Sequence, residues 1–246
     1  MLFRSIHDGT TQKREVLFEP RHAPMELRLI DSATVELYQP PTPHWGLESA
    51  MRYHLRPDGV IEMAFECIPR RAVFRNGYVG LFWASYIHQP ESPDVFFRGR
   101  RRDGTGDVGW IRGASPVHGE SAMHPGMGDD RSFAHDAAFP LTLVFNQSGY
   151  RYLDPWYFGV CRGMAFAQVF QPGDGVRFSQ SPSGGGAGNA AWDFQWFIEA
   201  PEVGRRYGFD MRAVYAPFQE SVEAGREALA AEVRQVAARA PEDRKS

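Results

Sequence analysis

The feature that most constrains the fold of this chain is a series of short segments in which apolar and polar residues alternate. They include "MELRLI", "ATVELY" and "VIEMAFECI", and turn-forming residues separate them. Such alternation is typical of β-strands, in which successive side chains point to opposite faces of a sheet. The 25 glycines and 18 prolines supply the turns that many short strands need. The sequence therefore predicts a mostly β protein.

The clearest predicted hairpin joins "MRYHL" to "VIEMAFECI" through a turn at Pro57, Asp58 and Gly59. In its second strand, Ile61 and alternate residues to Cys67 share one face, which we expect to be core. The segment "REVLF" (residues 14–18) is also expected to be a strand. Three later segments, "YVGLFWASYIH", "PWYFGVCRGMAFAQVF" and "AAWDFQWFIE", are apolar on both faces, so we expect strands that are covered on both sides.

The pattern changes after residue 218, where helical spacing replaces alternation. Val222, Leu229, Val233 and Val236 recur at intervals of seven, four and three residues, which predicts one amphipathic helix. We therefore expect one β-sandwich domain over residues 1–218, followed by a helix and a frayed tail over residues 219–246.

Charge and hydropathy argue against several classes of protein. The net charge of -3 argues against a nucleic-acid binder, because neutralising phosphates requires an excess of Lys and Arg. The sequence has no span of about 20 apolar residues, so it predicts no transmembrane helix. The N-terminus lacks the apolar core of a secretory signal. We therefore expect a cytoplasmic protein. Cys67 and Cys161 each lie within an apolar segment and are expected to be buried, unpaired thiols.

The sequence contains no phosphate loop, nucleophile elbow or dinucleotide fingerprint. Its most suggestive polar cluster is "VHGESAMH", which places His118, Glu120 and His124 close together in a long connection. Their irregular spacing matches no established metal motif, so no metal or cofactor is expected. A cupin-like metal enzyme that uses these histidines remains an alternative.

Arg162 and Asp193 break the apolar pattern of two predicted strands. A guanidinium among apolar groups needs an anion, unless a bulge at Gly159 or Gly163 turns it toward solvent. Asp193 is its natural partner, and Gln195 shares the face of Asp193.

Aromatic residues beside fixed polar groups suit the C–H faces and hydroxyls of a sugar. Trp45 follows His44 in the proline-rich "PPTPHWGLES", outside any central strand, and is the best stacking candidate. In "LFWASYIHQPE", Tyr86 and His88 share the face that we expect to meet a ligand, while Trp83 points to the core.

Four segments, "PTPHWGLES", "NGYVGLFWASYIHQPESPDVFF", "FSQSPSGGGAGNAAWDFQWFI" and "VYAPF", together resemble an uncharacterised bacterial family with the galactose-mutarotase-like β-supersandwich. The resemblance covers roughly residues 14–218. It implies a large antiparallel β-sandwich with a concave sheet face that binds carbohydrate. In the epimerases of that superfamily, a histidine protonates the ring oxygen and a glutamate deprotonates the anomeric hydroxyl. The epimerase signatures around that pair are absent here, so our candidates are chosen by position and chemistry.

Three hypotheses follow. The first is a carbohydrate-active enzyme, epimerase-like, lyase-like or hydrolytic, in which His88 or His118 is the general acid and Glu48 or Glu120 the base. Its substrate-binding residues would be His44, Trp45, Tyr86, Arg162, Asp193 and Gln195. The second is a carbohydrate-binding protein without catalysis, and the third is the cupin-like metal enzyme. The partner expected from the first two is a carbohydrate; the sequence leaves the oligomeric state open.

Overall fold

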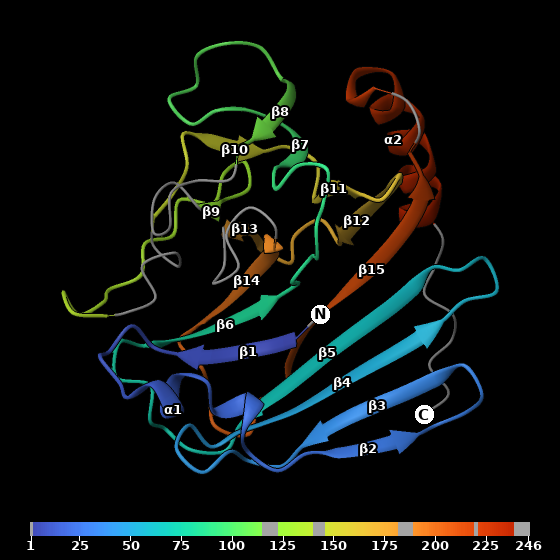
Figure 1. Cartoon of the computed structure of the whole chain (residues 1–246). Helices are drawn as coiled ribbons and strands as arrows, with labels where there is room; N and C mark the ends of the chain where they lie inside the picture. Colours follow the sequence, from blue (N-terminus) through green and yellow to red (C-terminus); the bar gives the residue numbers. More distant parts are fainter. Residues whose placement is uncertain (1, 115–122, 140–145, 182–188, 219–220, 239–246) are drawn as a thin grey trace.

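A computed structural model describes residues 2–114, 123–139, 146–181, 189–218 and 221–238. Within these residues, two antiparallel sheets lie face to face (Figure 1). The smaller sheet has five strands in the order β1 (Leu2–His7), β6 (Tyr78–Ala84), β14 (Ala191–Glu199), β13 (Arg177–Ser181) and β9 (Met123–His124).

The larger sheet has ten strands in the same part of the chain. Its order is β10 (Tyr150–Tyr152), β7 (Val95–Arg101), β11 (Trp156–Cys161), β12 (Met164–Phe170), β15 (Tyr207–Pro217), β5 (Ile61–Pro69), β4 (Leu47–Leu55), β3 (Thr34–Gln39) and β2 (Glu26–Leu29), with β8 (Gly109–Gly113) paired to β7. The short helix α1 (Arg14–Leu17) and the 3-10 turn η1 (Glu19–Arg21) connect β1 to β2. The predicted antiparallel β-sandwich is confirmed.

Aromatic side chains fill the space between the sheets. Phe3, Trp83 and Phe194 lie opposite one another on β1, β6 and β14, and neighbouring rings are stacked 4.9 and 5.0 Å apart. Phe65 and Phe209 of the larger sheet meet the Trp83 ring edge-on at 4.8 and 5.1 Å. Offset and edge-on contacts of this kind add to the stabilisation from burial. Trp83 is therefore a core residue, as its position in the strand predicts.

Helix α2 (Val222–Ala238) covers part of the other face of the larger sheet. Its buried residues Leu229, Val233 and Val236 pack with Trp156 and Phe158 of β11. The predicted C-terminal helix is confirmed, and so is the hairpin of β4 and β5, in which Leu55 lies opposite Ile61 across the turn. Cys67 is buried and Cys161 partly buried, and both are free thiols.

Three predictions of local structure are wrong or incomplete. Residues 14–17 form α1 and not a strand, because four residues are too few for alternation to be told from one helical turn. Residues 2–7, for which no strand was predicted, form β1. The segment predicted as one strand over residues 155–170 is a hairpin that turns at Arg162 and Gly163. Both turn residues have positive φ (54° and 70°), as a tight hairpin turn requires.

Candidate functional site

The outer face of the smaller sheet carries a set of buried polar residues. In β14, Trp192, Phe194 and Trp196 point into the core, so alternation places Asp193 and Gln195 on the outer face. Ser179 of β13 lies opposite Asp193. Ser5 of β1 lies opposite Phe82, which lies opposite Gln195. We refer to Arg4, Ser5, Ser179, Asp193 and Gln195 as the polar face.

Asp193 is the central acidic group of the polar face. It is 1% exposed, and its Oδ1 accepts a hydrogen bond from the backbone N–H of Ser85 at 3.0 Å. Burial raises the pKa of Asp193 to about 7, although the Ser85 N–H and the positive charge of Arg4 act in the opposite direction. Near neutral pH the carboxyl group can therefore either donate or accept a proton.

Three polar atoms of the polar face are buried without a hydrogen-bond partner in the described part of the chain. They are Asp193 Oδ2, Ser5 Oγ and Arg4 Nε. Gln195 donates from Nε2 to Ser179 Oγ at 3.1 Å, and the Arg4 guanidinium lies 5.4 Å from the centre of the Phe82 ring. Buried polar groups in native proteins are nearly always paired, so a group of unpaired atoms calls for an explanation. Donors and acceptors combined in this way fit the hydroxyl groups of a bound molecule.

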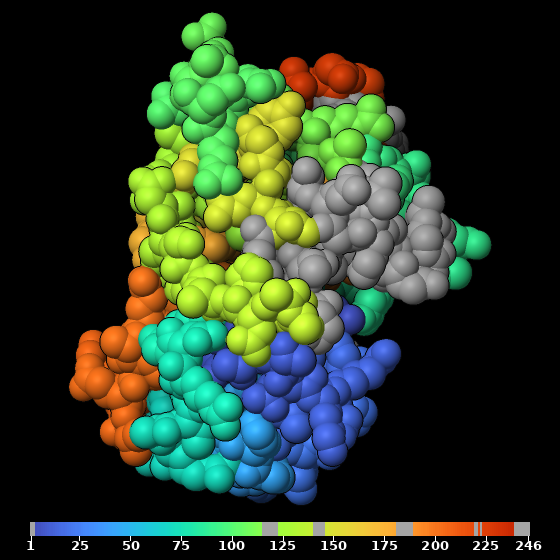
Figure 2. Space-filling model, turned by 90° about the vertical axis from the view of Figure 1, so that its left-hand side faces the viewer, coloured from blue at the N-terminus to red at the C-terminus, as the bar shows by residue number. Residues whose placement is uncertain are grey.

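The opposite end of the same sheet face is closed by residues 126–139. Asp129 accepts two hydrogen bonds from Arg177 at 2.8 and 3.0 Å, and Phe133 stacks on Phe197 at 4.1 Å. The Tyr78 hydroxyl donates to the Ala134 carbonyl at 2.9 Å. In Figure 2 this segment, drawn in yellow-green, lies against the N-terminal residues drawn in blue.

His7 lies beneath that segment and does not have the properties of an acid-base group near neutral pH. Burial lowers the pKa of His7 to about 3, despite the opposing charge of Asp8. Its ring lies 5.1 Å from the Phe139 ring, and Gly80 on the neighbouring strand leaves the space that the imidazole occupies. His7 is therefore a neutral packing residue at this face.

A separate pocket of about 480 Å³ lies beyond the end of β1. Its lining includes His44 and Trp45, together with Asp8, Thr11, Gln12, Ala72, Val73 and Arg75. The Glu19 carboxylate fixes this corner by accepting the backbone N–H groups of His44 and Trp45 at 2.6 and 3.1 Å. Trp45 is only 1% exposed and stacks on Phe74 at 5.4 Å, so it forms a wall of the pocket and not an open stacking surface.

The structure does not bring the predicted site residues into one cavity. Asp193 and Gln195 share the polar face, and His44 and Trp45 share the pocket. Glu48 lies on β4 of the larger sheet, where its carboxylate pairs with Arg70 at 2.6 Å. His118 and Glu120 lie outside the described residues.

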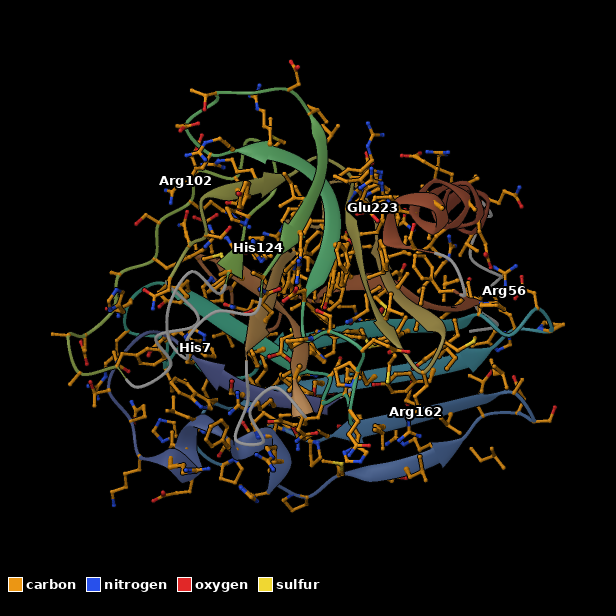
Figure 3. The ribbon with its side chains drawn as sticks, turned by 45° about the horizontal axis from the view of Figure 1, so that its top comes forward. His7, Arg56, Arg102, His124, Arg162 and Glu223 are labelled. Atoms are coloured by element: carbon orange, nitrogen blue, oxygen red, sulfur yellow. The ribbon has the colours of Figure 1, made fainter. Side chains whose placement is uncertain are left out.

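Tyr86, His88 and Arg162 lie near one edge of the sandwich. Tyr86 is 44% exposed and His88 is exposed beyond the end of β6, where its carbonyl accepts from Cys161 Sγ. Arg162 is at the tip of the β11–β12 hairpin, far from His7 in Figure 3, and Glu91 accepts its backbone N–H at 2.7 Å. The predicted pairing of Arg162 with Asp193 is wrong, because the hairpin turn exposes Arg162 whereas Asp193 is buried.

Sequence reasoning missed the contributions of Arg4, Ser5 and Ser179 to the polar face, and the backbone N–H of Ser85 that bonds to Asp193. The segment "LFRSIH" does not alternate, because the register shift between Phe3 and Ser5 places two polar residues after two apolar ones, so periodicity did not indicate β1. No sign in the sequence marks Ser179 either, because a serine in a strand is ordinary. Among the described residues, no group of three or more His, Cys, Asp or Glu side chains is arranged to hold a metal ion.

Comparison with known proteins gives similarity of structure but not of sequence. No family model and no curated protein matches this chain. Among solved structures, the α-N-acetylgalactosaminidase NagBb of Bifidobacterium bifidum matches 95% of this chain with a TM-score of 0.51 and 12% identity. Its complex with GalNAc matches 89% with a TM-score of 0.50 and 11% identity. The chain spans about a third of that glycosidase, with 33% and 32% of its length covered.

A candidate aldose 1-epimerase from Escherichia coli K12 also matches, over 88% of this chain and 82% of its own, with a TM-score of 0.49 and 11% identity. At these identities the matches concern the fold alone. The chain shares an antiparallel β-sandwich fold with part of that glycosidase, and the galactose-mutarotase-like assignment stays a prediction of the resemblance in sequence. No helix in the described residues is long and apolar enough to cross a membrane.

Proposed function

We propose that this protein binds a carbohydrate on the polar face, with Asp193 as the central hydrogen-bonding group. The observation that carries the proposal is the set of buried, unpartnered atoms on the same sheet face as that carboxyl group: Asp193 Oδ2, Ser5 Oγ and Arg4 Nε. Sugar hydroxyls both donate and accept, so they can pair with the hydroxyl, carboxyl and guanidinium atoms that this buried face leaves without partners in the described residues.

The fold adds support of a general kind. The solved structures similar to this chain include structures of a protein described as an α-N-acetylgalactosaminidase. One of these structures is a complex with GalNAc. A shared fold does not fix a shared activity, so the choice of ligand class depends on the polar face itself.

If the protein is an enzyme, Asp193 is the group best suited to acid-base chemistry in the described part of this face. A general acid or base works best when its pKa is close to the working pH, and burial brings the pKa of Asp193 to about 7. An epimerase needs both an acid and a base, and the roles assigned to His88, His118, Glu48 and Glu120 remain predictions. Binding is therefore the proposed function, and turnover is a second outcome to be measured.

The test is calorimetric titration of the protein with galactose, glucose and N-acetylgalactosamine, together with polarimetry of a freshly dissolved anomer. In Asp193→Leu we expect binding to weaken at least about tenfold, since a hydrogen bond to an ionisable group contributes about 1.5–3 kcal/mol. Gln168→Leu is the matched control, because Gln168 is also fully buried but bonds to Tyr157 and Trp192 on the core side.

His44→Ala distinguishes the polar face from the pocket. Unchanged affinity in His44→Ala with loss in Asp193→Leu supports the polar face. Loss in His44→Ala with unchanged affinity in Asp193→Leu would place the sugar in the pocket and overturn the proposal, as would the absence of binding to all three sugars. Anomer conversion by the wild type that disappears in Asp193→Asn would identify the protein as an enzyme.

A further inference from the structure

Strand β2 lies at the end of the larger sheet and forms its lower edge in Figure 1. It pairs with β3 from Glu26 opposite Tyr38 to Leu29 opposite Val35. No strand of the described residues pairs with its other side. An uncovered edge of this kind can pair with another chain.

The hydrogen bonds around the β2–β3 turn show which backbone groups point to the free edge. The N–H of Ile30 donates to the Thr34 carbonyl at 3.0 Å, and on the other side of β3 the N–H of Leu55 donates to the Ala33 carbonyl at 2.9 Å. Hydrogen-bonded and non-hydrogen-bonded pairs alternate along an antiparallel ladder. Arg28 and Glu26 therefore turn their backbone groups toward β3, whereas Leu27 and Leu29 turn theirs outward.

The side chains of β2 divide into an apolar and a charged face. Leu27 and Leu29 are 68% and 76% exposed on one face, and the preceding Met25 is 48% exposed. On the other face, Arg28 pairs with Glu26 at 3.0 Å and with Glu36 at 3.3 Å. Neighbouring large apolar side chains at this exposure are typical of an interaction surface.

We infer that β2 pairs in antiparallel fashion with β2 of a second copy of this chain, about a two-fold axis at Leu27. In this register the outward N–H and C=O groups of Leu27 bond to those of Leu27 in the second copy, and those of Leu29 bond to Met25. Glu26 then faces Arg28 of the second copy at a non-hydrogen-bonded position, where opposing side chains are closest. All apolar side chains fall on one face of the joined sheet.

Both the backbone and the charges select this register. An axis at Arg28 would place two arginines opposite each other and would require backbone groups that already face β3. An axis at Leu29 would place Arg28 opposite Ile30 and leave Glu26 without the opposing arginine. A two-fold interface is also the commonest arrangement in homo-oligomers.

Cysteine cross-linking tests the register directly. Two copies of Leu27 in a hydrogen-bonded pair would have Cα atoms about 5.5 Å apart, within the range of a disulfide. We expect Leu27→Cys to form a covalent dimer under mild oxidation. Leu29→Cys is the matched control, since its two copies would lie roughly 13 Å apart, too far to bridge. Equal cross-linking of both variants, or none in Leu27→Cys, would overturn the register.

Sedimentation of the unmodified chain tests the dimer itself. We expect the wild type to sediment as a dimer at tens of micromolar and Leu27→Lys to raise the dissociation constant at least tenfold, which corresponds to about 1.4 kcal/mol. Val203→Lys, at an apolar side chain that is 55% exposed elsewhere, should leave the dimer unchanged. Leu27 is mostly exposed, so an unaltered melting temperature should show that Leu27→Lys is folded. A wild type that is monomeric up to about 100 µM would overturn the inference.

Discussion

Asp193 makes a prediction about stability that is independent of any ligand. Its folded-state pKa is raised to about 7, so the folded protein holds a proton that the unfolded chain releases near pH 4. Between these two values, stability falls as the pH rises. Asp193→Asn removes the titration, and we expect the variant to gain roughly 2–3 kcal/mol over the wild type between pH 5 and pH 7.5.

The measurement is chemical denaturation of both proteins across that pH range. Asp193→Asn preserves the shape of the side chain and its acceptor for the Ser85 N–H. The difference in unfolding free energy should therefore grow with pH and level off above about pH 7. A difference that is constant across the range would show that Asp193 is ionised at low pH in the folded protein.

Gly159 makes a second prediction at the level of one residue. A Cβ atom at this position would lie 2.3 Å from Trp192 Cζ2, which is fully buried between the two sheets. We expect Gly159→Ala to destabilise the fold by about 1–3 kcal/mol, because a well-packed core has no room for the added methyl group. Gly149→Ala, where a Cβ atom would meet nothing within 4 Å, is the control in thermal unfolding. Equal melting temperatures for the two variants would contradict this packing.

The residues of the candidate site differ in how far the sequence predicts them. Alternation along β14 was sufficient to separate Asp193 and Gln195 from Trp192 and Trp196, and the structure agrees. It was not sufficient to find the partner of Asp193. Ser85, which bonds to Asp193 through its backbone N–H, directly follows β6, and Arg4, whose charge acts on Asp193, lies in β1. Neighbours so distant in sequence are fixed only by the topology of the sheet.

At the level of elements, the hairpin of β11 and β12 shows a limit of apolar patterns. Residues 155–170 are apolar almost throughout, so nothing in their periodicity marks an end of one strand and a beginning of the next. The turn at Arg162 and Gly163 is detectable only from the preference of glycine for positive φ. The hairpin of β4 and β5 was predictable because proline, aspartate and glycine coincide between its strands.

Helix α2 makes a prediction at the same level. Leu229 is 3% exposed and packs with the apolar residues of the larger sheet. We expect Leu229→Ala to lower the unfolding free energy by about 2–5 kcal/mol, the usual cost of such a truncation in a core. Glu232→Ala, on the exposed side of the helix, should have little effect.

The shape of the transition in the same denaturation experiment tests the domain organisation. If α2 folds as part of the sandwich, Leu229→Ala should shift one cooperative transition for the whole chain. If unfolding instead shows two transitions, and Leu229→Ala shifts only the one at lower denaturant concentration, residues 219–246 unfold apart from residues 1–218. The predicted domain boundary at residue 218 would then also mark a boundary of cooperativity.

For the whole molecule, the two-sheet architecture followed from alternation and turn residues, but the covering of the smaller sheet did not. Residues 102–139 have little periodicity, and only the structure shows that residues 126–139 close one end of the polar sheet face. The contact between Asp129 and Arg177 spans 48 residues and joins a loop to a strand. No local pattern encodes a pairing of that kind.

The ion pair of Asp129 and Arg177 is expected to contribute to the stability of the whole molecule. Burial by itself would raise the pKa of Asp129, but hydrogen bonds from Arg177 and Arg131 hold it below its usual range. Arg177 is 2% exposed, so Asp129→Asn leaves a buried guanidinium without its counter-charge. We expect a loss of about 3–5 kcal/mol at pH 7 and faster hydrogen exchange over residues 123–139.

The pH dependence and a neighbouring variant make this prediction specific. A carboxylate with a lowered folded-state pKa stabilises the protein above the unfolded value and loses that effect as the pH falls below about 4. The difference between wild type and Asp129→Asn should therefore shrink in acid. Asp130→Asn is the control, because Asp130 pairs with Arg151 at 2.6 Å but is 83% exposed, and such pairs contribute about 0–1 kcal/mol. If both variants exchange alike, the Asp129–Arg177 pair does not hold residues 126–139 against the smaller sheet.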